Sequence, residues 1–259
     1  MGLIASLPDI DKLPESVYVM HERDEKLIPF HQHTKGQLSY VEGGLAYVNL
    51  RNKTLVIPAR HYFWIPVGIE HMITVGHSAT VLRSLFFYAF DDDKEPFYTT
   101  LGIYPINDLL LQMIKYTEKW EGPVEPENPK YQFLSTIKNI LPENSTRMFP
   151  MALPFTDNNR MQVIIKYIES NISDVHTMQS ISDRFGLSDR SLSRLFQSTL
   201  GISFLQYLKL LRMIKALEMI LQADKSMSEI AYAIGYHSLS AFSNTFYQLT
   251  RLRPSDFNS

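Results

Sequence analysis

Short apolar segments separated by turn residues recur through the first part of the chain. They lie at residues 38–41, 45–50, 54–57, 62–65, 71–75 and 80–90. Short strands at intervals of about 8–12 residues are typical of a β-sandwich or a β-barrel. Residues 1–36 lack this pattern, and Pro8, Pro14 and Pro29 interrupt any long element there. We therefore predict a small β-barrel over residues 1–105, with an irregular segment at its beginning.

Two amphipathic helical patterns follow the predicted strands, over residues 106–120 and 131–141. The apolar face consists of Leu109, Leu110, Met113, Ile114 and Thr117 in the first helix, and of Phe133, Leu134, Ile137, Ile140 and Leu141 in the second. Such a pair can cover its own barrel or meet the same helices of a second subunit. We predict that residues 106–141 hold a homodimer together, and packing within the chain is the alternative.

The chain then changes character twice. Residues 142–157 contain Pro142, Pro150 and Pro154 and show neither a helical nor a strand period, so we predict a linker. An amphipathic helix begins near Arg160 and opens a second domain over residues 158–259. A chain of 259 residues is long enough for two domains that each have a core.

One pattern occurs twice between residues 178 and 257. Gly186 and Gly235 are 49 residues apart, and Phe196 and Phe246 are 50 apart, so the copies align with one residue inserted. In each copy a short helix leads to a glycine, which can adopt the positive φ of a tight turn, and then to a second helix. Each copy is therefore predicted to be a helix-turn-helix. For a single copy, an αα-hairpin that only packs within the protein is the alternative.

The outward faces of the two second helices carry candidate DNA-binding residues. These are Arg190, Ser193 and Arg194 in the first copy, and Ser240, Ser243 and Asn244 in the second. Arg pairs with guanine in the major groove, and Ser or Asn also reaches base edges. A predicted long helix over residues 203–221 would separate the copies by roughly 28 Å, close to the ~34 Å between successive major grooves. Because the second face has no Lys or Arg, we expect it to discriminate bases less than the first.

These residues bring the sequence close to a known family. The runs Leu187 to Phe196, Gly201-Ile202-Ser203-Phe204 and Ile230 to Tyr236 closely resemble the AraC/XylS family of bacterial transcription regulators. The resemblance implies sequence-specific binding to double-stranded DNA, a small-molecule effector and RNA polymerase as a further partner. Two positions depart from the family's pattern. Asn244 stands where an Arg or another strong base reader is usual, and Phe257-Asn258 stands where an aromatic-Arg pair closes the domain.

Histidines gather in the predicted barrel. His31-x-His33-x-x-x-Gln37 and Pro66-x-Gly68-x-x-His71 resemble the two motifs of the cupin barrel. Because residues i and i+2 of a strand share a face, His31 and His33 should look into the barrel together. Regulators of the AraC/XylS family often have a cupin-like N-terminal sensor, so the resemblance implies an effector-binding cavity. Its candidate residues are His31, His33, Gln37, Tyr40, Tyr47, Trp64, His71 and Arg83.

The same cluster decides whether a metal is expected. Metal-binding cupins use three His and a Glu, whereas Gln37 stands in the place of the Glu, and a neutral amide is a poorer ligand for a divalent cation. We therefore expect no metal and no other cofactor, although His31, His33 and His71 are the candidate ligands. A metal-dependent cupin enzyme with an accessory helical domain is the competing class. Since no Ser-His-Asp order, phosphate loop or paired carboxylate is present, we predict that the protein is not an enzyme.

Composition and charge indicate the cellular compartment and complete the predicted fold class. The sequence has no cysteine, which excludes disulfides and Cys-ligated zinc and fits a reducing cytoplasm. The N-terminus lacks the basic segment of a signal peptide, and no apolar run approaches the ~20 residues of a membrane span. From residue 156 onward, 11 Lys and Arg stand against 9 Asp and Glu, a slight excess of positive charge in a chain of net charge −2. We predict a cytoplasmic α+β protein, with a cupin-like barrel, a helical pair and an all-α domain of two helix-turn-helix units joined by a long helix.

Overall fold

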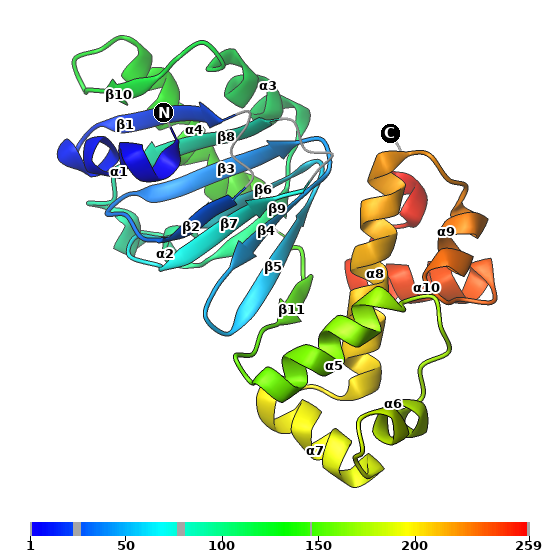
Figure 1. Cartoon of the computed structure of the whole chain (residues 1–259). Coiled ribbons are helices and arrows are strands. Elements are labelled where there is room, and N and C mark those ends of the chain that lie inside the picture. Colours follow the sequence, from blue (N-terminus) through cyan, green and yellow to red (C-terminus); the bar gives the residue numbers. More distant parts are fainter. Residues whose placement is uncertain (1, 23–26, 77–80, 146, 258–259) are drawn as a thin grey trace. The chain divides into compact units, whose positions relative to one another are not determined.

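The computed structural model describes residues 2–22, 27–76, 81–145 and 147–257. The chain divides into two compact units (Figure 1). Unit 1 comprises Met1–Asn49 and Ile57–Pro150, and unit 2 comprises Leu50–Val56 and Met151–Ser259. Leu50–Val56 belongs to unit 2 because a short strand at residues 152–154, near the start of the second part of this unit, pairs antiparallel with it. No helix in the described part of the chain is long and apolar enough to cross a membrane.

The strands form two sheets. They are β1 (Val17–Glu22), β2 (Leu27–His31), β3 (Gly36–Glu42), β4 (Leu45–Asn49), β5 (Lys53–Pro58), β6 (His61–Ile65), β7 (His71–Val75), β8 (Val81–Phe87), β9 (Gly102–Pro105), β10 (Gly122–Val124) and β11 (Ala152–Pro154). One sheet has the order β10-β1-β8-β3-β6-β9, and the other has the order β11-β5-β4-β7-β2. The predicted strand over residues 80–90 corresponds to β8, and Thr80 lies outside the described residues. Together with the helices, these sheets confirm the predicted α+β class.

The beginning of the chain is more regular than predicted. Residues 3–12 form α1 (Leu3–Lys12), and β1 and β2 follow. Pro8 lies inside α1, where the burial of Leu3 and Ile10 offsets the helix hydrogen bond that a proline cannot make. Pro29 lies in the edge strand β2, where the pairing with β7 is irregular between Ile28 and His31, so a residue without an N–H is tolerated there.

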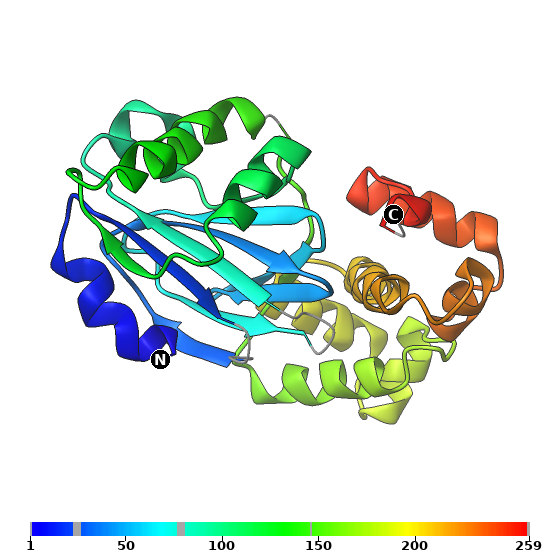
Figure 2. The same cartoon turned by 90° about the horizontal axis from the view of Figure 1, so that it is seen from above.

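Three helices cover one face of the six-stranded sheet (Figure 2). They are α2 (Pro96–Thr99), α3 (Asp108–Tyr116) and α4 (Lys130–Asn144). The side chains that pack on the sheet include Leu110, Ile114, Leu134, Ile137 and Leu141. The prediction that these side chains form a dimer interface is therefore wrong, because they pack against the apolar outer face of the sheet within the same chain. Leu109 and Tyr116 point away from this core and are 63% and 67% exposed.

Unit 1 also buries two lysines. Lys138 of α4 is 3% exposed, and its Nζ lies 2.5 Å from Oδ1 of Asp92, in the 3₁₀ turn η1 (Asp92–Lys94). The same ammonium donates to the carbonyl oxygen of Tyr88 and lies 4.2 Å from the centre of the Tyr88 ring. Lys35 is fully buried, and its Nζ donates to the carbonyl oxygens of Leu13, Pro14 and Ser16. Lys35 therefore ties the segment after α1 to the start of β3, while Lys138 ties α4 to η1.

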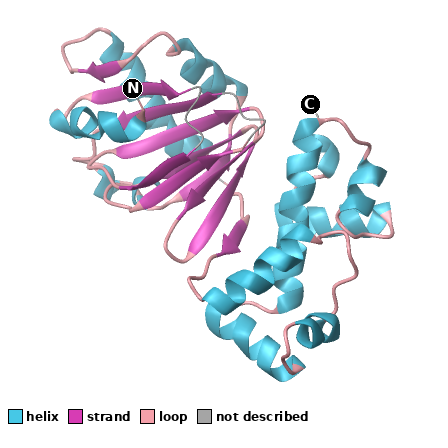
Figure 3. Cartoon of the chain, viewed as in Figure 1, coloured by secondary structure: helices cyan, strands magenta, loops and turns pink. Residues whose placement is uncertain are grey.

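Unit 2 is helical apart from β11 and the adjoining part of β5 (Figure 3). Its helices are α5 (Asn159–Ser170), α6 (Met178–Arg184), α7 (Asp189–Leu200), α8 (Phe204–Gln222), α9 (Met227–Ala233), α10 (Leu239–Thr250) and the 3₁₀ turn η2 (Pro254–Phe257). The repeat predicted two helix-turn-helix units around a long helix, and the pairs α6–α7 and α9–α10 on either side of α8 confirm it. Gly186 and Gly235 adopt φ values of 60° and 83°, as the turns require.

Candidate DNA-binding surface and histidine cluster

Helix α7 presents the first candidate DNA-binding face. Ser188 caps its N-terminus, because the side-chain oxygen accepts a hydrogen bond from the backbone N–H of Ser191. Buried Leu192, Phe196 and Leu200 fix the rotation of the helix. Arg190, Ser193 and Arg194 consequently lie exposed on the other side. Among the described residues, neither arginine joins an ion pair, so both guanidinium groups are available to a ligand.

Helix α10 presents the corresponding face of the second copy. Ser238 caps it through the backbone N–H of Ala241, and Phe242 and Phe246 are buried. Ser240 and Asn244 are exposed, whereas Ser243 is half-buried.

A groove of about 610 Å³ runs beside α10 and includes a basic residue from outside the helix. Its lining residues are Met227, Leu239, Ser243, Asn244, Tyr247, Arg253, Pro254 and Ser255. Arg253 is exposed there, and its backbone N–H donates to Oδ2 of Asp256 at 2.7 Å. The outward positions of α10 itself have no Lys or Arg, as the sequence indicated, but Arg253 places a positive charge beside them. Sequence reasoning missed Arg253 because it lies beyond the end of α10 and reaches this surface only through the turn into η2.

Arg212 of the long helix α8 lies between the segment that follows α5 and the second turn. Arg212 of α8 donates to the carbonyl oxygens of Asp174, at 2.8 Å, and Ile172, at 3.4 Å. A side chain at Gly235 would bring its Cβ to 2.4 Å from Nη2 of Arg212. Gly235 is therefore favoured chiefly for its positive φ, and its lack of a side chain also leaves room for this guanidinium.

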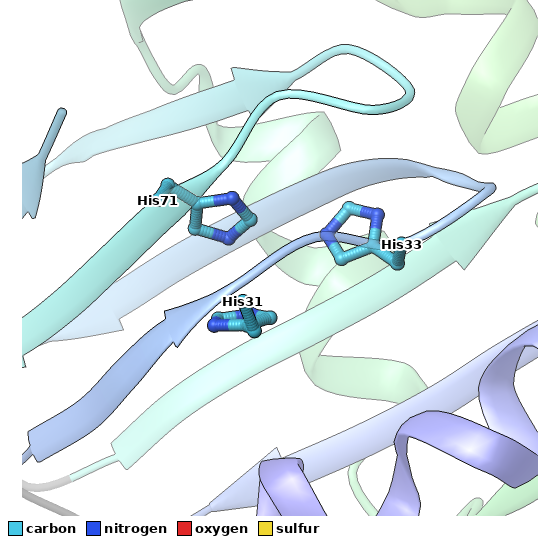
Figure 4. A group of neighbouring side chains, drawn as sticks. All are labelled: His31, His33 and His71. Carbon is cyan, nitrogen blue, oxygen red and sulfur yellow. The ribbon is translucent and has the colours of Figure 1, made fainter. Parts of the chain in front are cut away.

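The three predicted histidines meet inside unit 1 (Figure 4). His31 ends β2, His71 begins β7, and His33 lies between β2 and β3. Each ring offers one nitrogen, and these three nitrogens lie within 4.8 Å of one another. All three side chains are buried, with His71 fully so.

Backbone carbonyls orient each ring in the same way. Nδ1 of His31 lies 2.8 Å from the Pro29 oxygen, and Nδ1 of His71 lies 2.8 Å from the Ile69 oxygen. Nδ1 of His33 lies 2.6 Å from the oxygen of Lys35. A carbonyl only accepts hydrogen bonds, so each Nδ1 carries the proton and each Nε2 keeps a lone pair in the neutral ring.

The remaining nitrogens have few partners. Nε2 of His31 and Nε2 of His71 are buried without a hydrogen-bond partner in the described structure. Nε2 of His33 lies 2.9 Å from Oε1 of Gln37, whose amide nitrogen donates to Ser39. Burial lowers the pKa of all three rings, and that of His71 falls to about 3, so the neutral forms prevail near pH 7.

Comparison with known proteins connects these two sites to one family. The model of an AraC-like ligand binding domain matches residues 16–94, and that of a helix-turn-helix domain matches residues 181–259. The transcriptional regulator NimR of Escherichia coli K12 is 24% identical over 223 residues, which cover 86% of this chain and 79% of NimR. The transcriptional activator RhaS of Citrobacter koseri is 31% identical over 97 residues, which cover 38% of this chain and about a third (35%) of RhaS. The chain belongs to the AraC family of transcription regulators.

Two solved structures align with part or most of this AraC-family regulator. The C-terminal domain of AraT from Geobacillus stearothermophilus is 29% identical, with coverage of 39% of this chain and 84% of that chain and a TM-score of 0.38. ToxT of Vibrio cholerae with bound unsaturated fatty acid is 14% identical, with coverage of 94% and 95% and a TM-score of 0.38.

The AraC-family regulator thus has an N-terminal ligand-binding domain and a C-terminal helix-turn-helix domain of a type that binds DNA. Its relatives are transcription regulators, a class of protein that is generally not enzymatic. Of the two departures from the family's pattern, Asn244 is exposed on α10 and Phe257 is buried, while Asn258 lies outside the described residues.

Several predicted effector-binding residues lie away from the histidines. In β3, Gln37 and Ser39 face inward, whereas Tyr40 shares the opposite face with its cross-strand partner Arg83. Trp64 lies on that outer face as well, in the core beneath α2 and α4. Tyr47 pairs with Thr74, which lies three residues from His71 and so on the other face of β7. The expectation that these four residues share a cavity with the histidines is therefore wrong.

Inward-facing polar residues were missed instead. Oγ of Ser39 lies 2.7 Å from Oγ of Ser84, and both are buried behind Gln37. The period of two along β3 was the signal that could have found them, because Ser39 is two residues from Gln37. Arg83 is already engaged, since its Nη2 lies 2.9 Å from Oε2 of Glu42.

Proposed function

We propose that this AraC-family regulator binds specific duplex DNA sites mainly through α7, with α10 as a weaker reader, and acts on RNA polymerase in the cytoplasm. The exposed Arg190, Ser193 and Arg194 carry the proposal, because they lie on the second helix of a helix-turn-helix and lack ionic partners among the described residues. Bidentate Arg to guanine is the commonest specific contact in the major groove. Helix α8, 19 residues and thus about 28 Å long, suits two readers of adjacent grooves.

The two helix-turn-helix copies should contribute differently to the free energy of DNA binding. On the α10 surface, Arg253 supplies a positive charge for phosphate, whereas Ser240, Ser243 and Asn244 offer weaker base readout. Scrambling the operator bases under α7 should therefore abolish most specificity, and scrambling those under α10 should cost little. Replacing Arg253 by Ala should weaken binding to all sequences about equally and lower the salt slope by about 0.9.

The test begins with genomic fragments that the purified protein retains, whose sequencing supplies the operator. Gel shifts at two salt concentrations then compare wild type, Arg253→Ala and Arg194→Ala on intact and half-scrambled operators. Equal losses from the two scrambled halves would contradict the unequal roles. Binding to every duplex with the same affinity would contradict sequence-specific recognition itself.

A small molecule bound in the N-terminal domain would control this activity. Binding that favours one conformation shifts the population of the regulator between DNA-competent and DNA-incompetent states, and needs no contact with DNA. Couplings of this kind are typically about 1–3 kcal/mol.

The outer side of α3 supports a homodimer. Leu109, Met113 and Tyr116 recur four and three residues apart within α3, so they form one stripe, and Trp120 follows just beyond the end of the helix. The rings of Tyr116 and Trp120 pack around Phe133 of α4, at centroid distances of 5.2 and 5.7 Å. The stripe leaves large apolar groups exposed, and a second copy of the same stripe would cover them.

Leu109→Glu combined with Tyr116→Glu should yield a monomer, because carboxylates would be buried in the interface. Sedimentation at micromolar concentration measures the change. Val163→Glu is the matched control, since Val163 of α5 is similarly exposed, at 59%, and lies in unit 2. A monomeric wild type, with or without DNA, would rule out the proposed interface.

A further inference from the structure

The histidine cluster leaves buried lone pairs without donors. Nε2 of His31 and Nε2 of His71 lack any partner among the described groups, although each buried unsatisfied polar atom costs about 1–3 kcal/mol. Native proteins contain few such atoms, and two in neighbouring rings, with centroids 4.3 Å apart, indicate a missing ligand.

The contact between His33 and Gln37 points the same way. With its proton on Nδ1, His33 presents a lone pair to Oε1 of Gln37 at 2.9 Å, and that oxygen is also an acceptor. Two ligands about 2.1 Å from one ion and at right angles to each other lie about 3 Å apart. The separation therefore fits two neighbouring ligands of a cation. If the amide were turned to donate to His33, the lone pairs of His31 and His71 would still lack a donor.

A single water molecule cannot donate a hydrogen bond to every acceptor in this cluster. Water has two protons to donate, whereas the three imidazoles and the Gln37 oxygen present four acceptors. A cation can accept electron pairs from all four at once. The chain has also fixed the ring orientations beforehand, since the backbone carbonyls at Pro29, Lys35 and Ile69 hold the Nδ1 protons. Such outer partners typically orient histidines that ligate a metal.

We propose that His31, His33 and His71 bind one divalent transition metal ion through Nε2, with Oε1 of Gln37 as a fourth ligand. Imidazole ligands suit zinc, nickel, copper and iron. Neighbouring nitrogens about 2.1 Å from one ion lie about 3.0–3.4 Å apart at right or tetrahedral angles, so the present limit of 4.8 Å requires a pair to close by at most about 1.8 Å. The sequence suggested the opposite, because Gln37 replaces a carboxylate. The missing charge weakens the site but does not remove its three nitrogen ligands.

The site can be tested on the full chain after chelation has removed metals. Zn²⁺ and Co²⁺ are the probes. Their binding is measured by calorimetry, by elemental analysis after gel filtration and, for Co²⁺, by visible absorption. We expect one ion per chain and a melting temperature that rises with free metal concentration, because the ion binds the folded state. His31→Ala and His71→Ala should each lower the affinity more than about 100-fold, beyond the 10–100-fold typical of outer partners.

Two further variants keep the test decisive if an alanine variant fails to fold. Gln37→Glu adds a carboxylate at the fourth position and should raise the affinity for Zn²⁺. His61→Asn removes a buried histidine outside the cluster and should leave one ion bound. A folded wild type that binds far less than one equivalent of either ion would overturn the site. One equivalent that persists in folded His31→Ala or His71→Ala, or that Gln37→Glu does not tighten, would place the ion elsewhere. Gel shifts are not needed, so these outcomes stand apart from the test of DNA recognition.

Discussion

Replacing Arg190 and Arg194 together by Ala should weaken specific DNA binding by about 2–6 kcal/mol. Each lost bidentate contact with guanine costs about 1–3 kcal/mol, and both side chains are exposed on the same face of α7. The fold should survive, because neither guanidinium takes part in the core formed by Leu192, Phe196 and Leu200. Fluorescence anisotropy with the operator and with unrelated DNA measures the change.

The Lys versions of the same two positions form the control. Arg190→Lys with Arg194→Lys keeps both charges but loses the planar, bidentate guanidinium groups. Binding to unrelated DNA should then stay close to wild type, while the preference for the operator falls. If the alanine pair left operator affinity and base preference unchanged, α7 would not be the reading helix.

Lys138→Met should lower the free energy of unfolding of unit 1 by about 3–5 kcal/mol. The substitution leaves the Asp92 carboxylate buried without its cation, and breaking a buried pair costs about that much. Burial already raises the pKa of Asp92 and lowers that of Lys138, so the two charges depend on each other. Urea unfolding followed by tryptophan fluorescence reports this unit, because Trp64 and Trp120 are the only tryptophans and both lie in it.

A double variant distinguishes the loss of the Lys138–Asp92 attraction from the cost of burying the Asp92 carboxylate without a cation. Lys138→Met with Asp92→Leu removes both charges and should regain most of the lost stability, since apolar replacements of buried pairs are often neutral. A single variant that loses less than about 1 kcal/mol, or a double variant no better than the single, would show that the pair is not what stabilises α4 against η1.

The sequence predicted the helical unit better than the β unit, and the reason is local. Gly186 and Gly235 mark turns whose geometry depends on a few neighbouring residues, and the caps Ser188 and Ser238 act within one helical turn. Because the pattern occurs twice, each copy also supports the prediction made for the other. The α6–α7 and α9–α10 pairs therefore followed from pattern alone.

Residues of the β unit depend on which face of a sheet they occupy. Tyr40 and Trp64 were expected beside the histidines, but one step along a strand moves a side chain to the other face. The face is set by the pairing of β3 with β6 and β8, which the sequence does not contain. Arg253 was missed for a similar reason, because only the chain's turn after α10 brings it to the groove.

The expectation that no metal is bound rested on residue identities and did not consider how the rings are oriented. Residue identities alone favoured an empty site, since Gln37 is a weaker ligand than Glu. The hydrogen bonds from Nδ1 to backbone carbonyls, which decide where the lone pairs point, become visible only in the folded structure.

The register of β1 has a consequence during synthesis. Val17 pairs with Val124 of β10, and Tyr18 with Phe86 of β8, so β1 leaves the ribosome long before either partner exists. Phe86 follows Tyr18 by roughly 70 residues, and Val124 follows Val17 by roughly 110. At about 5–20 residues per second, both edges of β1 therefore lack a partner for about 3–14 s, until β8 has been made. Throughout that interval an apolar strand offers unpaired edges to other nascent chains. A chaperone that holds the first strands, or slower initiation that spaces ribosomes on the message, should therefore raise the yield of folded protein.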